Sequence, residues 1–170
     1  MRKLATVAFA VFAVVTASLA TNARAAGLNF GVGLHYLYTL GDIDEGDSEL
    51  SKNSFGIIGS VQTSLAMLKI EGNVEYIPDF IGSDEGLWEP SAYALFGSLI
   101  YGGAGIGVAN WNDEWTDPWY ALRAGVNLGL GGLGLDVYGT YRFWSDDALE
   151  DLNGEDLDSV TFAAVLRFGS

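Results

Sequence analysis

Seven charged side chains occupy alternating positions in otherwise apolar stretches of the chain. Four are basic and three are acidic: Lys69, Glu71, Glu75, Arg123, Asp136, Arg142 and Arg167. A buried charge must pair or be neutralised, because an isolated ion is costly to remove from water. If these groups share one interior, they form either a network of ion pairs or a charged path for a ligand or ion.

The single histidine, His35, is a second candidate for chemistry. A histidine can act as a general base toward a hydroxyl when a carboxylate orients its ring. Ser54 and Ser60 are the candidate hydroxyls, and Glu75 is the candidate carboxylate. This combination is a weak pattern, so we predict no catalytic residues. The chain has no cysteine, which excludes disulfides and thiol chemistry, and we predict no metal site and no cofactor.

Strands must position these residues, because polar and apolar residues alternate with a period of two. The pattern begins with LNFGVGLHYLY at residues 28–38 and returns seven times. All seven charges fall on one strand face, which would be roughly a one-in-sixty accident if the facing were random. The predicted strands cover residues 28–38, 54–65, 68–77, 91–101, 104–111, 119–130, 133–144 and 159–168.

The first 25 residues have the three parts of a secretory signal peptide. A charged start precedes an apolar run and the small-residue motif Ala23-Arg24-Ala25. We therefore predict a signal peptide at residues 1–25 and a single domain at 26–170. Cleavage leaves 145 residues with five basic and 22 acidic side chains, a net charge of −17. A chain this acidic is not expected to bind nucleic acid.

Long and short connections alternate between the predicted strands. The long ones, at 39–53, 78–90, 112–118 and 145–158, are acidic; the short ones are Ala66-Met67, Gly102-Gly103 and Gly131-Gly132. Glycine pairs suit the type I′ turns of tight hairpins. A turn at Gly102-Gly103 would place Tyr101 opposite Ala104. A turn at Gly131-Gly132 would place Leu128 opposite Leu135 and Asn127 opposite Asp136.

The strand face that lacks charges has aromatic residues near both of its ends. Near the long connections these are Tyr38, Phe55, Tyr76, Tyr93, Tyr120 and Phe143, and near the short ones Phe30, Tyr101 and Phe168. Two aromatic girdles around an aliphatic band mark the interfaces of a membrane. A soluble closed barrel is the alternative, but it would be apolar inside and polar outside. The sequence therefore predicts an all-β fold: an eight-stranded antiparallel transmembrane β-barrel.

Three segments resemble a known group of proteins. They are the signal peptide, the segment Tyr101-Gly-Gly-Ala-Gly-Ile-Gly-Val108 and the closing strand Val160-Thr-Phe-Ala-Ala-Val-Leu-Arg-Phe168. They are similar to those of small eight-stranded outer-membrane β-barrels of the OmpA and OmpX type. The resemblance implies a place in the cell outer membrane of a Gram-negative-type envelope, contact with lipid and lipopolysaccharide, and insertion by the barrel-assembly machinery. Some barrels of this size modify lipid A, which is the role that a His35 site would imply.

An eight-stranded barrel has an interior just wide enough for side chains. We therefore expect the seven charges to form a plug of ion pairs and hydrogen bonds, without porin-scale conductance. Large residues predicted to add to this filling are Phe96, Trp111, Trp119, Tyr138 and Trp144. A narrow channel is the alternative.

The acidic connections are predicted to be solvated, with bridging to anionic lipid through divalent cations as the alternative. None has the residue order of a calcium-binding EF-hand loop. Trp115, at the tip of the third long connection, is the best candidate for contact with an external partner, such as a sugar or a protein. The sequence as a whole predicts a monomeric, non-catalytic barrel with a role in envelope integrity or surface interaction. A lipid A-modifying enzyme and a narrow channel are the alternatives.

Overall fold

The computed structural model describes residues 27–40, 52–80, 86–111, 114–129, 133–143 and 158–169. Ten strands lie within these ranges: β1 (Leu28–Thr39), β2 (Asn53–Leu65), β3 (Leu68–Ile77), β4 (Leu87–Gly97), β5 (Ile100–Gly107), β6 (Asn110–Trp111), β7 (Glu114–Trp115), β8 (Trp119–Gly129), β9 (Leu133–Phe143) and β10 (Ser159–Gly169). No helix among the described residues is long and apolar enough to cross a membrane. The predicted signal peptide lies outside these ranges, as do most of the acidic connections.

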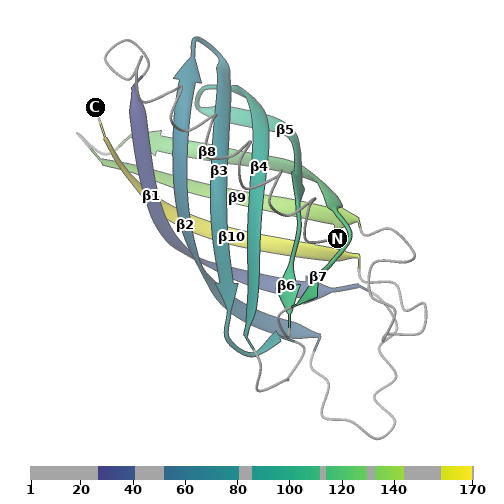
Figure 1. Ribbon diagram of the computed structural model, residues 1–170. Coiled ribbons are helices and arrows are strands. Elements are labelled where there is room, and N and C mark those ends of the chain that lie inside the picture. Colours follow the sequence, from purple (N-terminus) through teal and green to yellow (C-terminus); the bar gives the residue numbers. More distant parts are fainter. Residues whose placement is uncertain are drawn as a thin grey trace, which may run out of the picture.

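Eight of the strands in the described part of the chain close into a barrel (Figure 1). The pairing order is β1, β2, β3, β4, β5, β8, β9 and β10, and β10 pairs with β1 to complete the ring. Every neighbouring pair in this ring is antiparallel. The short strands β6 and β7 form an extra hairpin joined to β4 through Trp88 and Asn110. The predicted eight-stranded antiparallel barrel is confirmed.

Six of the predicted strands match the structure to within one residue at each end. The turn at Ala66-Met67 is also correct, and Ala66 has a φ of 57°, as the first residue of a two-residue hairpin turn requires. On either side of the third short turn the predicted register is confirmed, because Leu128 pairs with Leu135 and Asn127 with Asp136. The turn residues Gly131-Gly132 lie outside the described ranges.

The hairpin turn predicted at Gly102-Gly103 is wrong. β4 ends at Gly97, which has a φ of 126°, and the turn residues are Ser98-Leu99. Only glycine adopts such a φ readily, so Gly97 is the residue that permits this turn. Both predicted turn glycines lie within β5. A Cβ atom on Gly103 would meet the backbone oxygen of Ala94 at 2.1 Å, so this glycine allows two strands to approach closely.

The displaced turn inverts the predicted facing of β4. Tyr93 and Tyr101, predicted on the lipid face, point into the barrel and are 2% and 3% exposed. Phe96, predicted inside, is 63% exposed on the outer face. The predicted pairing of Tyr101 with Ala104 is also wrong, since Ala104 pairs with Ala94. Phe96 therefore takes the place of Tyr101 in the girdle near the short turns.

β4 also begins four residues earlier than predicted, at Leu87. Pro90 lies inside this strand, opposite Val74 of β3, although proline lacks an N–H for pairing. Its carbonyl oxygen accepts a hydrogen bond from the N–H of Val108, 3.2 Å away and one residue beyond the end of β5. In an antiparallel strand the N and O atoms of a residue point the same way. The missing N–H therefore falls where the β4–β5 ladder stops.

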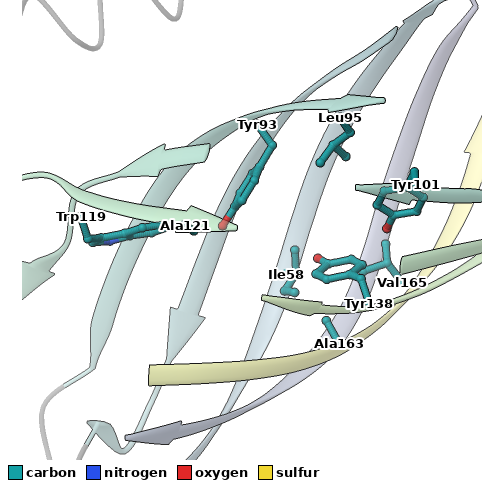
Figure 2. Packing of buried hydrophobic residues seen from close by; sticks show 9 residues of the cluster. All are labelled: Ile58, Tyr93, Leu95, Tyr101, Trp119, Ala121, Tyr138, Ala163 and Val165. Carbon is teal, nitrogen blue, oxygen red and sulfur yellow. The ribbon is translucent and has the colours of Figure 1, made fainter. Parts of the chain in front are cut away.

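The barrel interior contains an apolar layer as well as charges (Figure 2). Tyr93, Tyr101, Trp119 and Tyr138 project inward around a set of smaller aliphatic side chains: Ile58, Leu95, Ala121, Ala163 and Val165. The outer face exposes large apolar residues on every barrel strand, among them Leu34, Ile57, Val74, Phe96, Ile106, Leu122, Val137 and Leu166.

Candidate functional site

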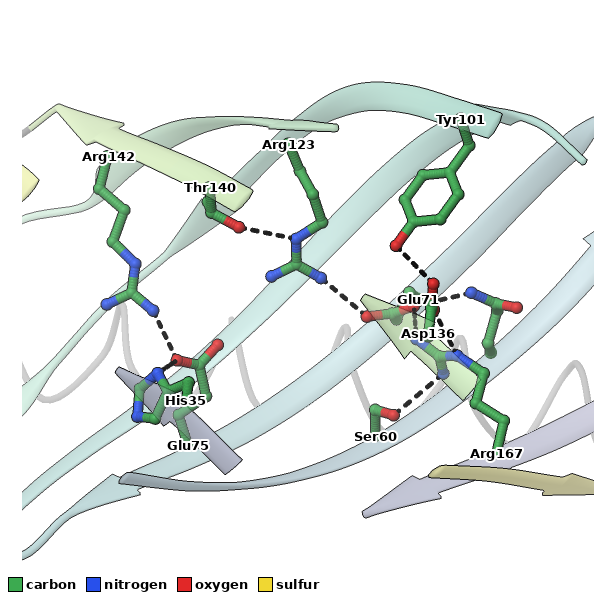
Figure 3. Close-up of polar contacts among 11 residues, drawn as sticks. His35, Ser60, Glu71, Glu75, Tyr101, Arg123, Asp136, Thr140, Arg142 and Arg167 are labelled. Atoms are coloured by element: carbon green, nitrogen blue, oxygen red, sulfur yellow. Dashed lines mark hydrogen bonds and ion pairs between the residues drawn. The ribbon is translucent and has the colours of Figure 1, made fainter. Parts of the chain in front are cut away.

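Ion pairs near the short-turn end of the interior form one tightly bonded group (Figure 3). We call it the short-turn cluster; it comprises Ser60, Gln62, Glu71, Tyr101, Arg123, Asp136 and Arg167. Arg167 uses all three of its nitrogens: Nε binds Asp136 Oδ2 at 2.6 Å, Nη2 binds Glu71 Oε2 at 2.6 Å, and Nη1 donates to Ser60 Oγ at 3.1 Å. These bonds join strands that are distant in the sequence, because β2, β3, β9 and β10 each contribute a residue.

Both carboxylates of the short-turn cluster are fully used. Glu71 Oε1 accepts from Arg123 Nη1 at 2.8 Å, and Glu71 Oε2 accepts from Gln62 Nε2 at 2.7 Å in addition to Arg167. The second oxygen of Asp136 accepts from the Tyr101 hydroxyl at 2.7 Å. Each of these oxygens has at least one donor, so the desolvation of two carboxylates is offset by directed bonds.

Arg123 connects this cluster to the aromatic layer. Its guanidinium lies between two rings, 3.5 Å from the centroid of Tyr93 and 3.9 Å from that of Tyr138. Its Nε donates to Thr140 Oγ1 at 3.0 Å. A cation between two ring faces is stabilised without a further carboxylate. The two tyrosines therefore help to hold a buried charge as well as filling space.

A second group lies nearer the long connections. We call it the long-loop cluster; it comprises His35, Glu75, Glu89 and Arg142. Arg142 binds Glu75 Oε2 through Nη2 at 2.5 Å and Glu89 Oε2 through Nη1 at 2.7 Å. His35 Nδ1 lies 3.0 Å from the same Glu75 oxygen. The Arg142 guanidinium also lies 4.7 Å from the ring centroid of Trp119.

The long-loop cluster leaves several buried polar atoms without a hydrogen-bond partner among the described residues. These include Glu89 Oε1, Arg142 Nε and His35 Nε2. The hydroxyl of Tyr93 and both side-chain amide atoms of Asn73 also lack a hydrogen-bond partner among the described residues. Buried polar atoms normally have partners, which can be water molecules. The two clusters thus differ in how fully their hydrogen-bonding capacity is used within the described protein.

The structure places all seven sequence-predicted charges inside the barrel, and it adds Glu89. With Glu89 the barrel strands contain four basic and four acidic residues, so the interior is balanced when His35 is neutral. Glu89 was missed because residues 78–90 were predicted to form a long connection, although Leu87, Glu89 and Ser91 continue the alternation of β4. Tyr93 and Tyr101 were missed because the turn between them was misplaced.

The arrangement considered for a His35 base is only half assembled. His35 and Glu75 are in contact, but neither predicted hydroxyl bonds to the ring. Ser60 Oγ accepts from Arg167, and Ser54 Oγ donates to the carbonyl oxygen of Asp79 at 3.1 Å. His35 is 2% exposed, and its Nε2 faces Gly56, where a Cβ atom would approach it within 1.9 Å. Among the described residues, no group of three or more potential metal ligands occurs.

Large rings occupy the space that the inward glycines leave. A Cβ atom on Gly105 would lie 2.3 Å from Cδ1 of Tyr93, and one on Gly107 would lie 2.3 Å from Cζ2 of Trp119. Trp119 and Tyr138 are buried as predicted, and Trp111 is partly buried against a second apolar cluster that includes Phe80. The fifth predicted filling residue, Trp144, lies outside the described ranges.

Trp115 is exposed to 47% on β7. It pairs with Asn110, which in turn pairs with Trp88 of β4. Side chains directly opposite each other in a sheet share a face, so Trp88 and Trp115 flank Asn110 in one row. Trp88 is 49% exposed and packs on Tyr76, with ring centroids 4.5 Å apart. Trp115 therefore continues the outer aromatic girdle onto the extra hairpin.

No known protein family matches this sequence, and no curated protein is detectably similar to it in sequence. Solved structures share its architecture. Neisserial surface protein A (NspA) aligns with a TM-score of 0.58 and 13% identity, over 85% of this chain and 97% of that protein. This chain has the fold of a small outer-membrane β-barrel. A de novo designed transmembrane β-barrel aligns with a TM-score of 0.50 and 11% identity, over 85% and 95% of the two chains. Ail, the attachment invasion locus protein of Yersinia pestis, aligns with a TM-score of 0.48 and 18% identity, over 84% and 99%.

Proposed function

We propose that this protein is a monomeric, non-catalytic barrel of a Gram-negative-type outer membrane, which acts in envelope integrity or surface interaction through its long-loop rim. One observation carries the proposal. Every charged side chain of the eight described barrel strands is buried inside, while the outer face exposes large apolar residues. Lipid around an interior closed by side chains is the environment that explains this arrangement.

Leu122 tests the facing most directly, because it lies mid-strand on β8 and is 57% exposed. Leu122→Arg should cost about 2–4 kcal/mol of unfolding free energy in phospholipid bilayers. Leu122→Phe is the matched control and should cost little, since it keeps an apolar side chain against lipid. Equal effects of the two variants in urea titrations would contradict a lipid-facing β8.

The filled interior supports a closed barrel rather than a channel. Arg123, Arg142 and Arg167 are each 3% exposed or less, and paired carboxylates and aromatic rings surround them. We expect planar-bilayer recordings of the pure protein to show no steady porin-scale conductance. Reproducible open steps that change in Arg142→Gln would instead favour the narrow channel.

The rim that remains for function contains Trp115 and the acidic connections. A deletion strain complemented with variants can separate the two proposed roles. We expect wild-type protein to restore the barrier to a large hydrophobic dye. Trp88→Ala serves as the matched control for Trp115→Ala, because the two rings are almost equally exposed in the same row. Failure of Trp115→Ala alone would indicate a specific contact, and restoration by both variants would favour envelope integrity. Failure of wild-type protein to restore the barrier would overturn the proposed role.

The proposed partners are outer-membrane lipid and lipopolysaccharide, with the barrel-assembly machinery during insertion. Acidic connections can bridge to anionic lipid phosphates through divalent cations. If they do, magnesium should raise the thermal stability of the protein more in bilayers containing lipopolysaccharide than in neutral detergent. The same stabilisation in both environments would contradict the bridging and leave the connections as solvated segments.

A further inference from the structure

The mouth of the barrel at the short-turn end contains a cavity of about 580 Å³ that the ion pairs do not fill. Strand ends and the Ser98-Leu99 turn form its wall. Besides Ser98, the polar residues that line it are Asn29, Gln62, Ser64, Lys69, Asn127 and Arg167. None of the lining residues is acidic. The polar part of the lining therefore consists of amides, hydroxyls and cations, and Leu99, Leu133 and three glycines complete it.

Lys69 is the unusual member of this lining. Its ammonium donates to the carbonyl oxygen of Ser98 at 3.1 Å and lies 4.6 Å from the ring centroid of Tyr101. The nearby carboxylates, Glu71 and Asp136, form their ion pairs with arginines. Among the described residues, Lys69 thus has no carboxylate at ion-pair distance. An ammonium has three N–H donors, so capacity remains for an additional acceptor.

The charge around this mouth is positive. The short-turn cluster contains two arginines and two carboxylates, and Lys69 adds one uncompensated positive charge. The strand ends that the predicted acidic connections join lie at the opposite end of the barrel. A strand of ten residues is about 30 Å long, and the interaction between two charges weakens with distance. Negative charge at the far strand ends therefore opposes an anion at this mouth only weakly.

We propose that the short-turn mouth binds an oxyanion, specifically a phosphate group. A phosphate offers several acceptor oxygens, which match the Lys69 ammonium and the side-chain amides of Asn29 and Asn127 around it. The volume falls within the range of small-molecule sites, about 300–1,000 Å³, so the group can belong to a larger molecule. A small soluble phosphate and the head group of a phospholipid share this chemistry.

Titration with inorganic phosphate tests the site in wild-type protein purified in a nonionic detergent. The side-chain amide signals of Asn29 and Asn127 in ¹H–¹⁵N spectra should shift saturably with sodium phosphate, and not with sodium chloride at matched ionic strength. Lys69→Met should weaken the apparent affinity about tenfold or more, the effect of losing a charge-assisted hydrogen bond. Lys69→Arg should retain binding, and Lys52→Met, at the long-loop end, is the matched control.

Nanodiscs distinguish the two sources of phosphate. Shifts that depend on Lys69 and occur in phosphatidylglycerol nanodiscs without added phosphate would indicate a lipid head group. Saturable shifts with inorganic phosphate in detergent would indicate a soluble ligand. Either result supports the site. Equal responses to phosphate and chloride in detergent, together with nanodisc spectra that Lys69→Met leaves unchanged at these amides, would overturn it. Full phosphate binding by Lys69→Met would overturn it as well.

Discussion

The two halves of the barrel interior handle buried charge differently. In the short-turn cluster all three nitrogens of Arg167 and all four oxygens of Glu71 and Asp136 have bonded partners. In the long-loop cluster one arginine serves two glutamates, and Glu89 Oε1 and Arg142 Nε have no hydrogen-bond partner among the described residues. Ion pairing is thus present in both clusters, but among the described residues only the short-turn cluster has a donor on every carboxylate oxygen.

This difference predicts unequal tolerance to substitution. Removing one member of a complete network exposes its partners to the full cost of being buried and unpaired. A substitution at an atom that already lacks a protein partner breaks no hydrogen bond, so it should lower the free energy of unfolding less. The short-turn cluster should therefore be the rigid part of the plug, and the long-loop cluster the part that accepts change.

The largest expected effect comes from Arg167→Met. This change leaves Glu71 and Asp136 buried with fewer donors, and breaking such a buried pair costs about 3–5 kcal/mol. Urea unfolding of the barrel in lipid vesicles, followed by tryptophan fluorescence, measures the loss. Arg167→Lys is the control: it keeps the charge but not the three directed bonds, so it should cost less. A loss below about 1 kcal/mol for Arg167→Met would show that the short-turn network does not stabilise the fold.

A matched pair of glutamates sharpens the comparison. Glu71→Gln should cost about 2–3 kcal/mol, because an amide NH₂ must then face arginine or glutamine donors. Glu89→Gln should cost less than about 1 kcal/mol, since its NH₂ can take the unpartnered Oε1 position while the amide oxygen still accepts from Arg142. The same vesicle titrations compare the two variants. Equal losses would indicate that the clusters are equally constrained.

Two tyrosines give the smallest and most selective test. Tyr101→Phe removes the donor to Asp136 Oδ1 and should cost about 1–2 kcal/mol. Tyr93→Phe keeps the ring that stacks on Arg123 and removes a hydroxyl without a hydrogen-bond partner among the described residues, so the change should stay within about 0.5 kcal/mol. Thermal unfolding in one detergent is sufficient to rank them. A larger loss for Tyr93→Phe would mean that its hydroxyl is bonded in solution.

Most of the barrel was predictable because lipid outside and packed charge inside impose a strict two-residue alternation. This alternation placed seven interior charges and the register of β8 with β9 correctly. The prediction failed across β4 and β5, because the turn was assigned from the local Gly102-Gly103 pair. Gly102-Gly103 is typical of a tight turn, yet Gly103 is needed for close strand packing, and Gly97 makes the turn. The specific bonds could not be predicted, because partners such as Arg167 and Glu71 are brought together only when the ring closes.

The fit of Tyr93 against Gly105 and of Trp119 against Gly107 has an evolutionary consequence. Neither position of such a pair can change in size independently, since even one added methyl group at the glycine would overlap the ring. Relatives of this chain that carry a larger residue in place of Gly105 should carry a smaller one in place of Tyr93, so the two positions should covary. A smaller side chain in place of Tyr93, opposite an unchanged Gly105, would instead leave unfilled space in the barrel interior.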